Sequence, residues 1–501
     1  MADTDTAIRP PLSFASKFSY SVGSAAYGLK GVALGAVMLY YNQVLGLPVI
    51  WVSQGIGVAL IVDAIASPVV GQISDMWRSS WGRRHPFMYF SAAPVAIAVW
   101  ALFSPPHGWS NANLFAYMLA CIIIARVALA MFEIPNSSLM PEMVTNYHER
   151  TTILSYRYFM SIFAPVVASF IGLNLLLKPF VNAQGHHMPG QLNPAGYPMA
   201  GLSLAICIFA AIMISSLGTH REIKYMRPPV KHASLGSLFG VIATTLFNRN
   251  FLALTTAGIV YAVGVGVVGG LGAYINTYFW ELSAHEISLI TLSSICAPLI
   301  AIPLGPFIAK KFGKKRAVLW NFFASVFIGI IPLSLRLVGI LPPNGDPVII
   351  PILIMDTILS GTLSIMGFII VSSMFADIVE QVQVETGKRS EGLLFSADTM
   401  LKQIVSGVGA MGTGYILAFI RFPAKAIPGE VPQEVLTTLV LIYLPIMTLA
   451  SIVAISLISF YSISRQQHES NLAKIGAAPG ASHAATAIEP DQERGLASES
   501  A

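Results

Sequence analysis

Twelve apolar stretches, each long enough to cross a lipid bilayer, occupy most of this 501-residue chain. A membrane-spanning helix needs about 20 mostly apolar residues at about 1.5 Å per residue. Hydrocarbon offers no partner for open backbone hydrogen-bonding groups, so these stretches must be helices, because barrel strands would alternate polar and apolar residues. The stretches fall at 18–41, 50–73, 87–103, 114–134, 153–177, 199–217, 251–279, 287–308, 317–340, 348–375, 395–419 and 436–463.

The scarcity of charge excludes the main alternative, a large soluble helical protein. Charged residues make up 11% of the chain and apolar residues 55%. A soluble protein of this kind would need charged faces that recur with the period of a helix, and these faces are missing. The sequence therefore predicts an all-α membrane protein with twelve transmembrane helices.

Basic residues gather in alternate connections between the stretches. They lie at 78–84, 221–249 and 310–316, whereas the connections at 46–48 and 105–113 carry almost none. Positive-inside bias then predicts that both termini lie in the cytoplasm of a cell whose membrane the chain crosses. The net charge of +5 reflects this topology and gives no reason to expect nucleic-acid binding.

The twelve stretches divide into two sets of six. We expect a cytoplasmic segment at 1–17, a bundle at 18–218, a basic cytoplasmic connection at 219–250, a second bundle at 251–464 and a disordered tail at 465–501. Gly82-Arg83-Arg84 opens the third stretch and Gly313-Lys314-Lys315 opens the ninth. Corresponding basic turns in the two halves are typical of a duplicated transporter.

A few charged residues lie inside the stretches, where each costs roughly 3 kcal/mol unless it has a partner or a function. Asp398 and Lys402 are spaced i, i+4, which favours an internal ion pair, so a structural bridge remains an alternative to a substrate contact. Asp63, Glu133 and Arg157 come from three different stretches of the first half. An acid in a central cavity can take up a proton or bind a hard cation, and a guanidinium can hold a substrate oxygen. The other charged residues of this kind are Lys30, Arg126 and Asp356.

Six short motifs follow one another along most of residues 20–460. They are VDAIASPVVG at 62–71, SDMWRSSWGRRHP at 74–86, EIPNSSLMP at 133–141, ERTT at 149–152 with Tyr156-Arg157, ADIV at 376–379, and TGKRSEG at 386–392 with Lys402 beyond it. Together they resemble the glycoside–pentoside–hexuronide:cation symporters, which are major-facilitator carriers related to melibiose permease. The resemblance implies two six-helix bundles with a midplane site between them.

The resemblance also implies roles for individual residues. Asp63 matches the cation-site aspartate, and Glu133 lies where the family presents an acid near the sugar and cation sites. The expected cation-coupling residues are Asp63, Glu133 and Ser67. The expected substrate-binding residues are Tyr27, Glu133, Arg157, Asp398 and Lys402. The expected cytoplasmic gate consists of Asp75, Arg78, Gly82, Arg83 and Arg84.

The chain departs from the family pattern at three positions. Ser67 stands where the family often has a second acid, and Ala66 stands where it often has an Asn. Because a sodium site would lose a carboxylate and an amide oxygen, the proton becomes the better prediction for the coupling ion, with sodium at Asp63 as the alternative. Tyr27 replaces a sugar-holding aspartate, which puts melibiose-like recognition in doubt.

These observations favour a secondary active transporter that imports a glycoside or related polar solute by cation-coupled symport. Two alternatives stay open: a carrier of an amphipathic or organic-acid solute, and a non-transporting sensor or scaffold. No Walker-type phosphate loop or hydrolase motif is present, so neither an ATP-driven pump nor an enzyme is expected. We expect no cofactor, the lipid bilayer, a solute and a coupling cation as partners, and a monomer.

Overall fold

The computed structural model describes residues 12–144, 147–225, 249–386, 391–463 and 465–476. The expectations made for 1–11, for most of the basic connection (226–248), for the loop at 387–390 and for the tail beyond 476 lie outside these residues.

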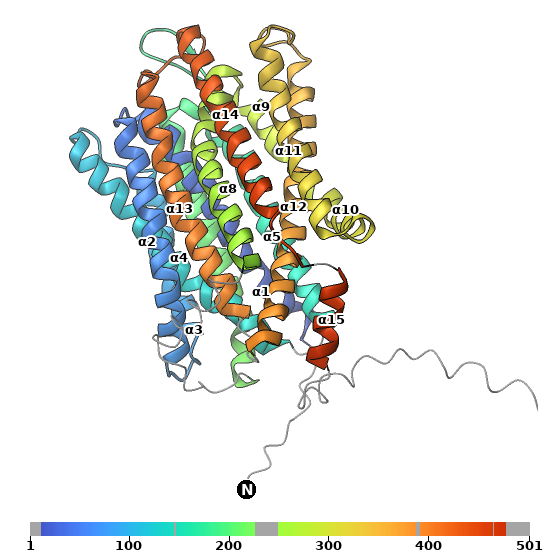
Figure 1. Cartoon of the computed structure of the whole chain (residues 1–501). Helices are drawn as coiled ribbons and strands as arrows, with labels where there is room; N and C mark the ends of the chain where they lie inside the picture. Colours follow the sequence, from blue (N-terminus) through green and yellow to red (C-terminus); the bar gives the residue numbers. More distant parts are fainter. Residues whose placement is uncertain (1–11, 145–146, 226–248, 387–390, 464, 477–501) are drawn as a thin grey trace, which may run out of the picture.

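Twelve membrane-length spans are present within the described residues (Figure 1), which confirms the predicted number. Eleven are long and apolar enough to cross a bilayer, and α13, which carries Asp398 and Lys402, is the twelfth. The first half contains α1 (Phe14–Leu39), α2 (Val49–Met76), α3 (His85–Leu102), α4 (Asn111–Met143), α5 (Tyr147–Ile171) and α6 (Tyr197–Thr219). The second half contains α8 (Arg249–Tyr274), α9 (Ala284–Ser293), α10 (Cys296–Phe312), α11 (Lys314–Leu337), α12 (Ile349–Thr386), α13 (Glu391–Phe419) and α14 (Gln433–Ile458).

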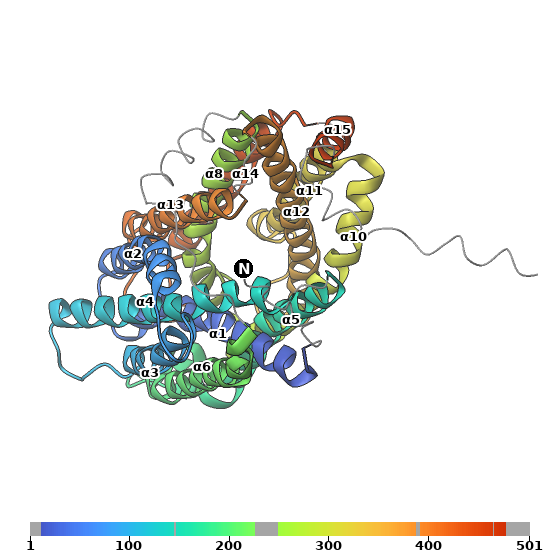
Figure 2. The ribbon, with the colours of Figure 1, turned by 90° about the horizontal axis from the view of Figure 1, so that it is seen from below.

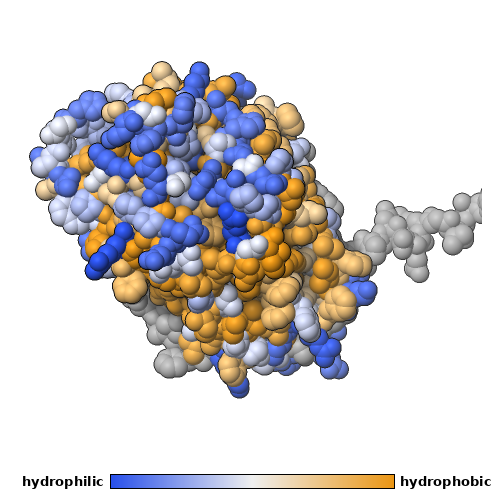
Figure 3. All heavy atoms as spheres, turned by 90° about the horizontal axis from the view of Figure 1, so that it is seen from above, coloured by the Kyte–Doolittle hydropathy of each residue, from blue (hydrophilic) through white to orange (hydrophobic). Residues whose placement is uncertain are grey.

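The two halves form separate bundles around a common axis. Seen along that axis, α1–α6 lie on one side and α8–α14 on the other (Figure 2). We call one end of the molecule the basic end, because the connection at 77–84, η5 (His220–Tyr225) and the first turn of α11 lie there. The opposite end shows polar side chains over its connections and apolar ones on its flanks (Figure 3).

The first span of each half repeats at a separation of 235 residues. Helices α1 and α8 begin at 14 and 249, and each passes into a π-helical turn, η1 (Tyr40–Val44) and η6 (Ile275–Phe279). Both turns are followed by a residue with positive φ, Gly46 at 86° and Glu281 at 51°. The sequence analysis expected the repeat from the basic turns alone and missed these π-helical turns.

Helix α13 joins the halves, because it packs closely against α2 in one half and α8 in the other. A Cβ atom on Gly57 would lie 2.6 Å from the carbonyl oxygen of Gly407, and one on Gly266 would lie 2.4 Å from that of Ser406. Small residues of this kind let helix backbones approach closely inside a membrane.

The structure differs from the expectations at three places. The stretch at 287–308 is broken between α9 and α10, because Pro298 cannot donate a hydrogen bond to the carbonyl of Ser294. Helices α4 and α12 continue to Met143 and Thr386, well past the apolar stretches. The tail does not lose structure at Arg465, because α15 (Arg465–Gly476) forms there and buries Asn471.

A short two-stranded hairpin, β1 (Phe180–Val181) and β2 (His187–Met188), and the turns η2 (Gly172–Leu176), η3 (Gly190–Leu192) and η4 (Pro194–Gly196) connect α5 to α6. They lie at the end opposite the basic end, where His186 Nε2 is 3.3 Å from Glu430 Oε1.

Candidate functional site

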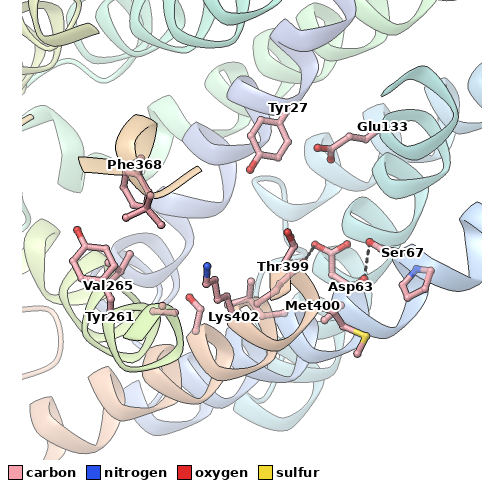
Figure 4. Close-up of a pocket in the computed structure, with 18 of the residues that line it drawn as sticks. Tyr27, Asp63, Ser67, Glu133, Tyr261, Val265, Phe368, Thr399, Met400 and Lys402 are labelled. Carbon is pink, nitrogen blue, oxygen red and sulfur yellow. Dashed lines mark hydrogen bonds between the residues drawn. The ribbon is translucent and has the colours of Figure 1, made fainter. Parts of the chain in front are cut away.

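A cavity of about 1180 Å³ lies between the two halves. Its lining runs from Tyr27 and Val265, near mid-height, to Asp75 in the last turn of α2, so it occupies the half of the molecule nearer the basic end. Figure 4 shows Tyr27, Glu133 and Asp63 on one side of this cavity and Phe368 and Tyr261 on the other.

Asp63 is the most strongly held acid of the cavity. Its Oδ2 accepts hydrogen bonds from Arg126 Nη1 at 3.0 Å and from Gln403 Nε2 at 2.7 Å. Asp63 is 3% exposed and Arg126 8%, so the pair is buried, and the low dielectric strengthens its attraction. Arg126 belongs to α4 and Gln403 to α13, so Asp63 joins three helices and both halves.

Two further expected residues lie close to Asp63. Ser67 lines the cavity one turn later on α2, and its Oγ donates to the carbonyl oxygen of Asp63 at 2.9 Å. Glu133 also lines the cavity, and its Oε2 is 3.8 Å from Lys30 Nζ. The ammonium of Lys30 lies over the ring of Tyr27, 4.8 Å from its centre.

On the second half, Lys402 and Asp398 form the ion pair that their spacing predicts, with Nζ 2.6 Å from Oδ2. Only Lys402 lines the cavity, and its ammonium also lies 5.0 Å from the centre of the Phe375 ring. Asp398 is buried beside it, so in this structure the acid holds the lysine and does not itself face the cavity.

Arg157 lies outside the main cavity. Its Nε donates to Ser24 Oγ at 3.0 Å and its Nη1 to Tyr20 OH at 2.9 Å. Arg157 and Ser24 line a side pocket of about 280 Å³ that shares Tyr27 and Glu133 with the main cavity. Arg157 therefore lines only the side pocket, whereas Tyr27 and Glu133 line both the side pocket and the main cavity.

The expected gate residues form contacts within the first half. Arg84 Nη2 is 3.0 Å from Glu142 Oε1 and 3.4 Å from Asp75 Oδ1, and Arg83 also binds Glu142. Burial lowers the pKa of the Arg84 guanidinium, and the carboxylates of Glu142 and Asp75 counter that shift. Gly82 has a φ of 74°, and Arg78 is exposed.

The second half carries a corresponding cluster at the basic end. Asp377, 235 residues after Glu142, receives Lys314 Nζ at 2.6 Å and Tyr461 OH at 3.0 Å. His468 Nδ1 from α15 lies 3.3 Å from Asp377 Oδ1 and 2.8 Å from Glu380 Oε2. Metal-ligand atoms of Asp377, Glu380 and His468 lie within 4.8 Å of one another, but the lysine ammonium already occupies the cation position on Asp377.

The end opposite the cavity mouth is closed by what we call the tyrosine–amide seal: Asn42, Gln43, Tyr274 and Tyr278. Tyr274 OH donates to Asn42 Oδ1 at 2.7 Å, and Tyr278 OH donates to Gln43 Oε1 at 2.9 Å. All four side chains are less than 5% exposed. Each half contributes two of them from its π-helical turn or the residue before it, so the seal holds the halves together.

Two residues of this site, Gln403 and Glu142, were not predicted, and Arg126 was named as a charge inside an apolar stretch without a partner or role. The i, i+4 rule found Lys402–Asp398 because both residues are on one helix, whereas Asp63 and Arg126 meet only through the packing of α2 on α4.

Comparisons with known proteins agree with this geometry. Residues 19–465 match the family model described as MFS/sugar transport protein, where MFS denotes the major facilitator superfamily. The isoprimeverose transporter of Lactiplantibacillus pentosus is 24% identical over 417 residues, which are 81% of this chain and 80% of that protein. The putative glycoside/cation symporter YagG of Escherichia coli K12 is 22% identical over 93% of this chain and 96% of that protein. Among solved structures, the inward open conformation of the xylose transporter XylE from E. coli matches with a TM-score of 0.62 at 12% identity, covering 92% of this chain and 99% of that one.

Proposed function

Because the chain belongs to the MFS/sugar transport protein family, we propose that it is a proton-coupled symporter of a neutral glycoside. Family membership makes it a multi-pass membrane transporter for sugar-type solutes, and not an enzyme. The coupling ion, the charge of the solute and the residues that carry coupling are our proposals. The observation that carries them is the Arg126–Asp63–Gln403 contact at the wall of the cavity.

Asp63 is the proposed coupling acid because its charge state affects both halves. While ionised, it satisfies the buried Arg126 guanidinium and accepts the amide of Gln403 from the other half. Protonation removes the negative charge that holds Arg126. The contact between α2 and α13 then weakens, so that proton binding changes the balance between conformations of the two halves.

The surroundings of Asp63 suit a proton better than sodium. A hard cation needs several oxygen ligands, whereas a proton needs only the carboxylate. Arg126 Nη1 lies 3.0 Å from Asp63 Oδ2 and would repel a metal ion at that oxygen. Ser67 Oγ directs its hydrogen to a backbone carbonyl of its own helix.

A neutral solute fits because the charges that line the cavity are balanced. Each has a partner of opposite charge among the described residues. The pairs are Lys30–Glu133, Arg126–Asp63, Arg84–Asp75 and Lys402–Asp398. An organic acid would need a cation without such a partner, so these pairs favour a glycoside over an organic acid. A scaffold would have no use for four ion pairs around an open cavity.

The arrangement of the two ends supports an orientation as well. We place the basic end in the cytoplasm by the positive-inside rule, and both termini with it. The cavity then faces the cytoplasm, and the tyrosine–amide seal closes the external side of a chain that acts as a monomer in a cell membrane.

The test is uptake by proteoliposomes with proton and sodium gradients imposed separately, against labelled methyl and phenyl xylosides, glucosides and galactosides. We expect accumulation with a pH gradient that is alkaline inside. Asp63→Asn should abolish accumulation but retain solute exchange at zero gradient, because the neutral amide mimics the protonated acid. Glu434→Gln, the same change at an exposed site on α14, should accumulate solute normally.

Each other outcome has a defined meaning. Accumulation driven only by sodium would overturn the proton assignment. Undiminished accumulation by Asp63→Asn would show that another residue is the coupling acid. No uptake of any glycoside under either gradient, by protein that melts cooperatively, would overturn the glycoside assignment.

A further inference from the structure

The two walls of the cavity differ in chemistry. The first half contributes the charged and hydroxyl groups around Asp63, Glu133 and Tyr27. The second half contributes a surface that we call the apolar wall: Tyr261, Val265, Phe322, Phe368 and Val371, with Met400 beside it.

Side chains of the apolar wall face the cavity and are not fully covered by neighbouring helices. Phe368 is 53% exposed and Val265 is 47% exposed, and both line the cavity. Tyr261 lies between Phe322 and Phe368, with ring centres 5.9 Å away in each case, so the three rings form one aromatic surface. A large apolar surface left open in a water-accessible cavity usually marks a binding site.

The internal repeat sharpens this contrast. In the 235-residue register, Glu133 on α4 corresponds to Phe368 on α12, and Lys30 on α1 corresponds to Val265 on α8. An ion pair in one half thus stands where the other half has an apolar pair, at equivalent places around the cavity. A free sugar carries hydroxyl groups around its rim, and several of these would lack partners against the apolar wall even where a C–H face of the ring stacks on an aromatic side chain.

We propose that the solute is amphipathic: a glycoside whose sugar binds the first half and whose apolar, ring-bearing aglycone packs against the apolar wall. This inference rests on the proposed function and assigns the substrate class of the same cavity. A volume of about 1180 Å³ leaves room for an aglycone beside the sugar. Pockets for drug-sized ligands occupy about 300–1,000 Å³.

The first test compares methyl and phenyl glycosides of the same sugar in proteoliposomes. For each sugar that is transported, we expect a KM for the phenyl glycoside at least about tenfold below that for the methyl glycoside, because the phenyl ring is buried against the apolar wall. Equal KM values would overturn this inference while leaving the symport proposal intact. No uptake of either compound, for any sugar, would overturn the glycoside assignment of the proposed function.

The second test locates the aglycone. Phe368→Ala should raise the KM for the phenyl glycoside about tenfold and leave the KM for the methyl glycoside within about twofold. Phe323→Ala, on the exposed face of α11 and outside the cavity lining, is the matched control and should change neither value. Should Phe368→Ala fold poorly, Val265→Ser provides a second site on the apolar wall, with the same expected split between the two KM values.

A change of equal size for both glycosides would contradict this placement of the aglycone. A preference for a lysophospholipid or a long-chain fatty acid in competition assays, with no effect of phenyl glycosides, would also contradict it, because the apolar wall would then serve a lipid chain.

Discussion

The two halves share one framework but use it differently. At the basic end, both carry an acid on the long fourth helix that binds the start of the neighbouring helix: Glu142 with Arg83 in one half and Asp377 with Lys314 in the other. At the cavity, the first half contributes five of the six charged lining residues, and the second half contributes Lys402 together with aromatic and aliphatic side chains. The repeated positions thus maintain structure, and the diverged positions are those to which we assign recognition.

The largest expected effect comes from leaving a buried charge unpaired in the first half. Arg126→Ala removes the guanidinium from Asp63, which is 3% exposed, and should destabilise the protein by about 3–5 kcal/mol. Asp398→Asn, in the second half, should cost markedly less, because the Lys402 side chain that it leaves without a partner is 28% exposed. Melting temperatures in detergent measure both changes.

A double variant provides the control for this comparison. Arg126→Ala with Asp63→Asn should recover a large part of the lost melting temperature, because no buried charge remains without a partner. Equal losses for Arg126→Ala and Asp398→Asn would show that the halves do not differ in the way described.

A second prediction concerns the place where the halves touch. A Cβ on Gly57 would lie 2.4 Å from Met411 Cγ and 2.6 Å from the Gly407 carbonyl oxygen, so Gly57→Leu forces α2 away from α13. Transport should fall at least tenfold, with a stability loss of about 1–3 kcal/mol. Gly31→Leu, where an added Cβ meets nothing within 4 Å, is the control in an uptake assay. Normal transport by Gly57→Leu would mean that this contact is not needed for alternation.

The third prediction tests the equivalence of the basic-end clusters. Glu142→Gln and Asp377→Asn each remove the carboxylate of a partly buried, charge-assisted cluster, so each should cost about 1.5–3 kcal/mol. Thermal melting in detergent should give similar losses for the two variants and almost none for Glu434→Gln. A clear difference between the stability losses of Glu142→Gln and Asp377→Asn would show that the halves are equivalent in their backbone but not in these charged clusters.

The smallest effect is expected at α15, which has no counterpart among the described residues of the first half. His468→Ala removes the contacts with Asp377 and Glu380, and because the histidine side chain is 26% exposed the change should cost about 0.5–1 kcal/mol. Limited proteolysis near Arg465 should become faster than in Gln466→Ala, which alters an exposed residue of the same helix. An unchanged cleavage rate would show that other contacts hold α15.

Local sequence patterns predicted the parts of the structure that depend on residues close together in the chain. Runs of apolar residues set the twelve spans, and i, i+4 spacing found the Lys402–Asp398 pair. The break before Pro298 was missed because proline also occurs inside unbroken helices here, such as Pro68 in α2. Helix α15 was missed because its composition resembles that of the tail, and its contact with α12 is tertiary.

The candidate site depended on packing that no local pattern contains. Asp63 was singled out by its place in an apolar stretch, but its partners Arg126 and Gln403 are 63 and 340 residues away. The apolar wall was also not anticipated, because an aromatic residue in a membrane helix ordinarily faces lipid or a neighbouring helix. Only the arrangement around the cavity separates Phe368 from the many other exposed aromatics.

The tyrosine–amide seal has a consequence for how solution conditions act on the transport cycle. Its hydrogen bonds join uncharged groups, whereas the basic end is held by ion pairs. Dissolved salt screens charges over a Debye length of about 10 Å at 0.1 M and has little effect on neutral hydrogen bonds. We therefore expect ionic strength to act mainly on the conformational steps that rearrange the basic end, and to change the opening of the seal much less.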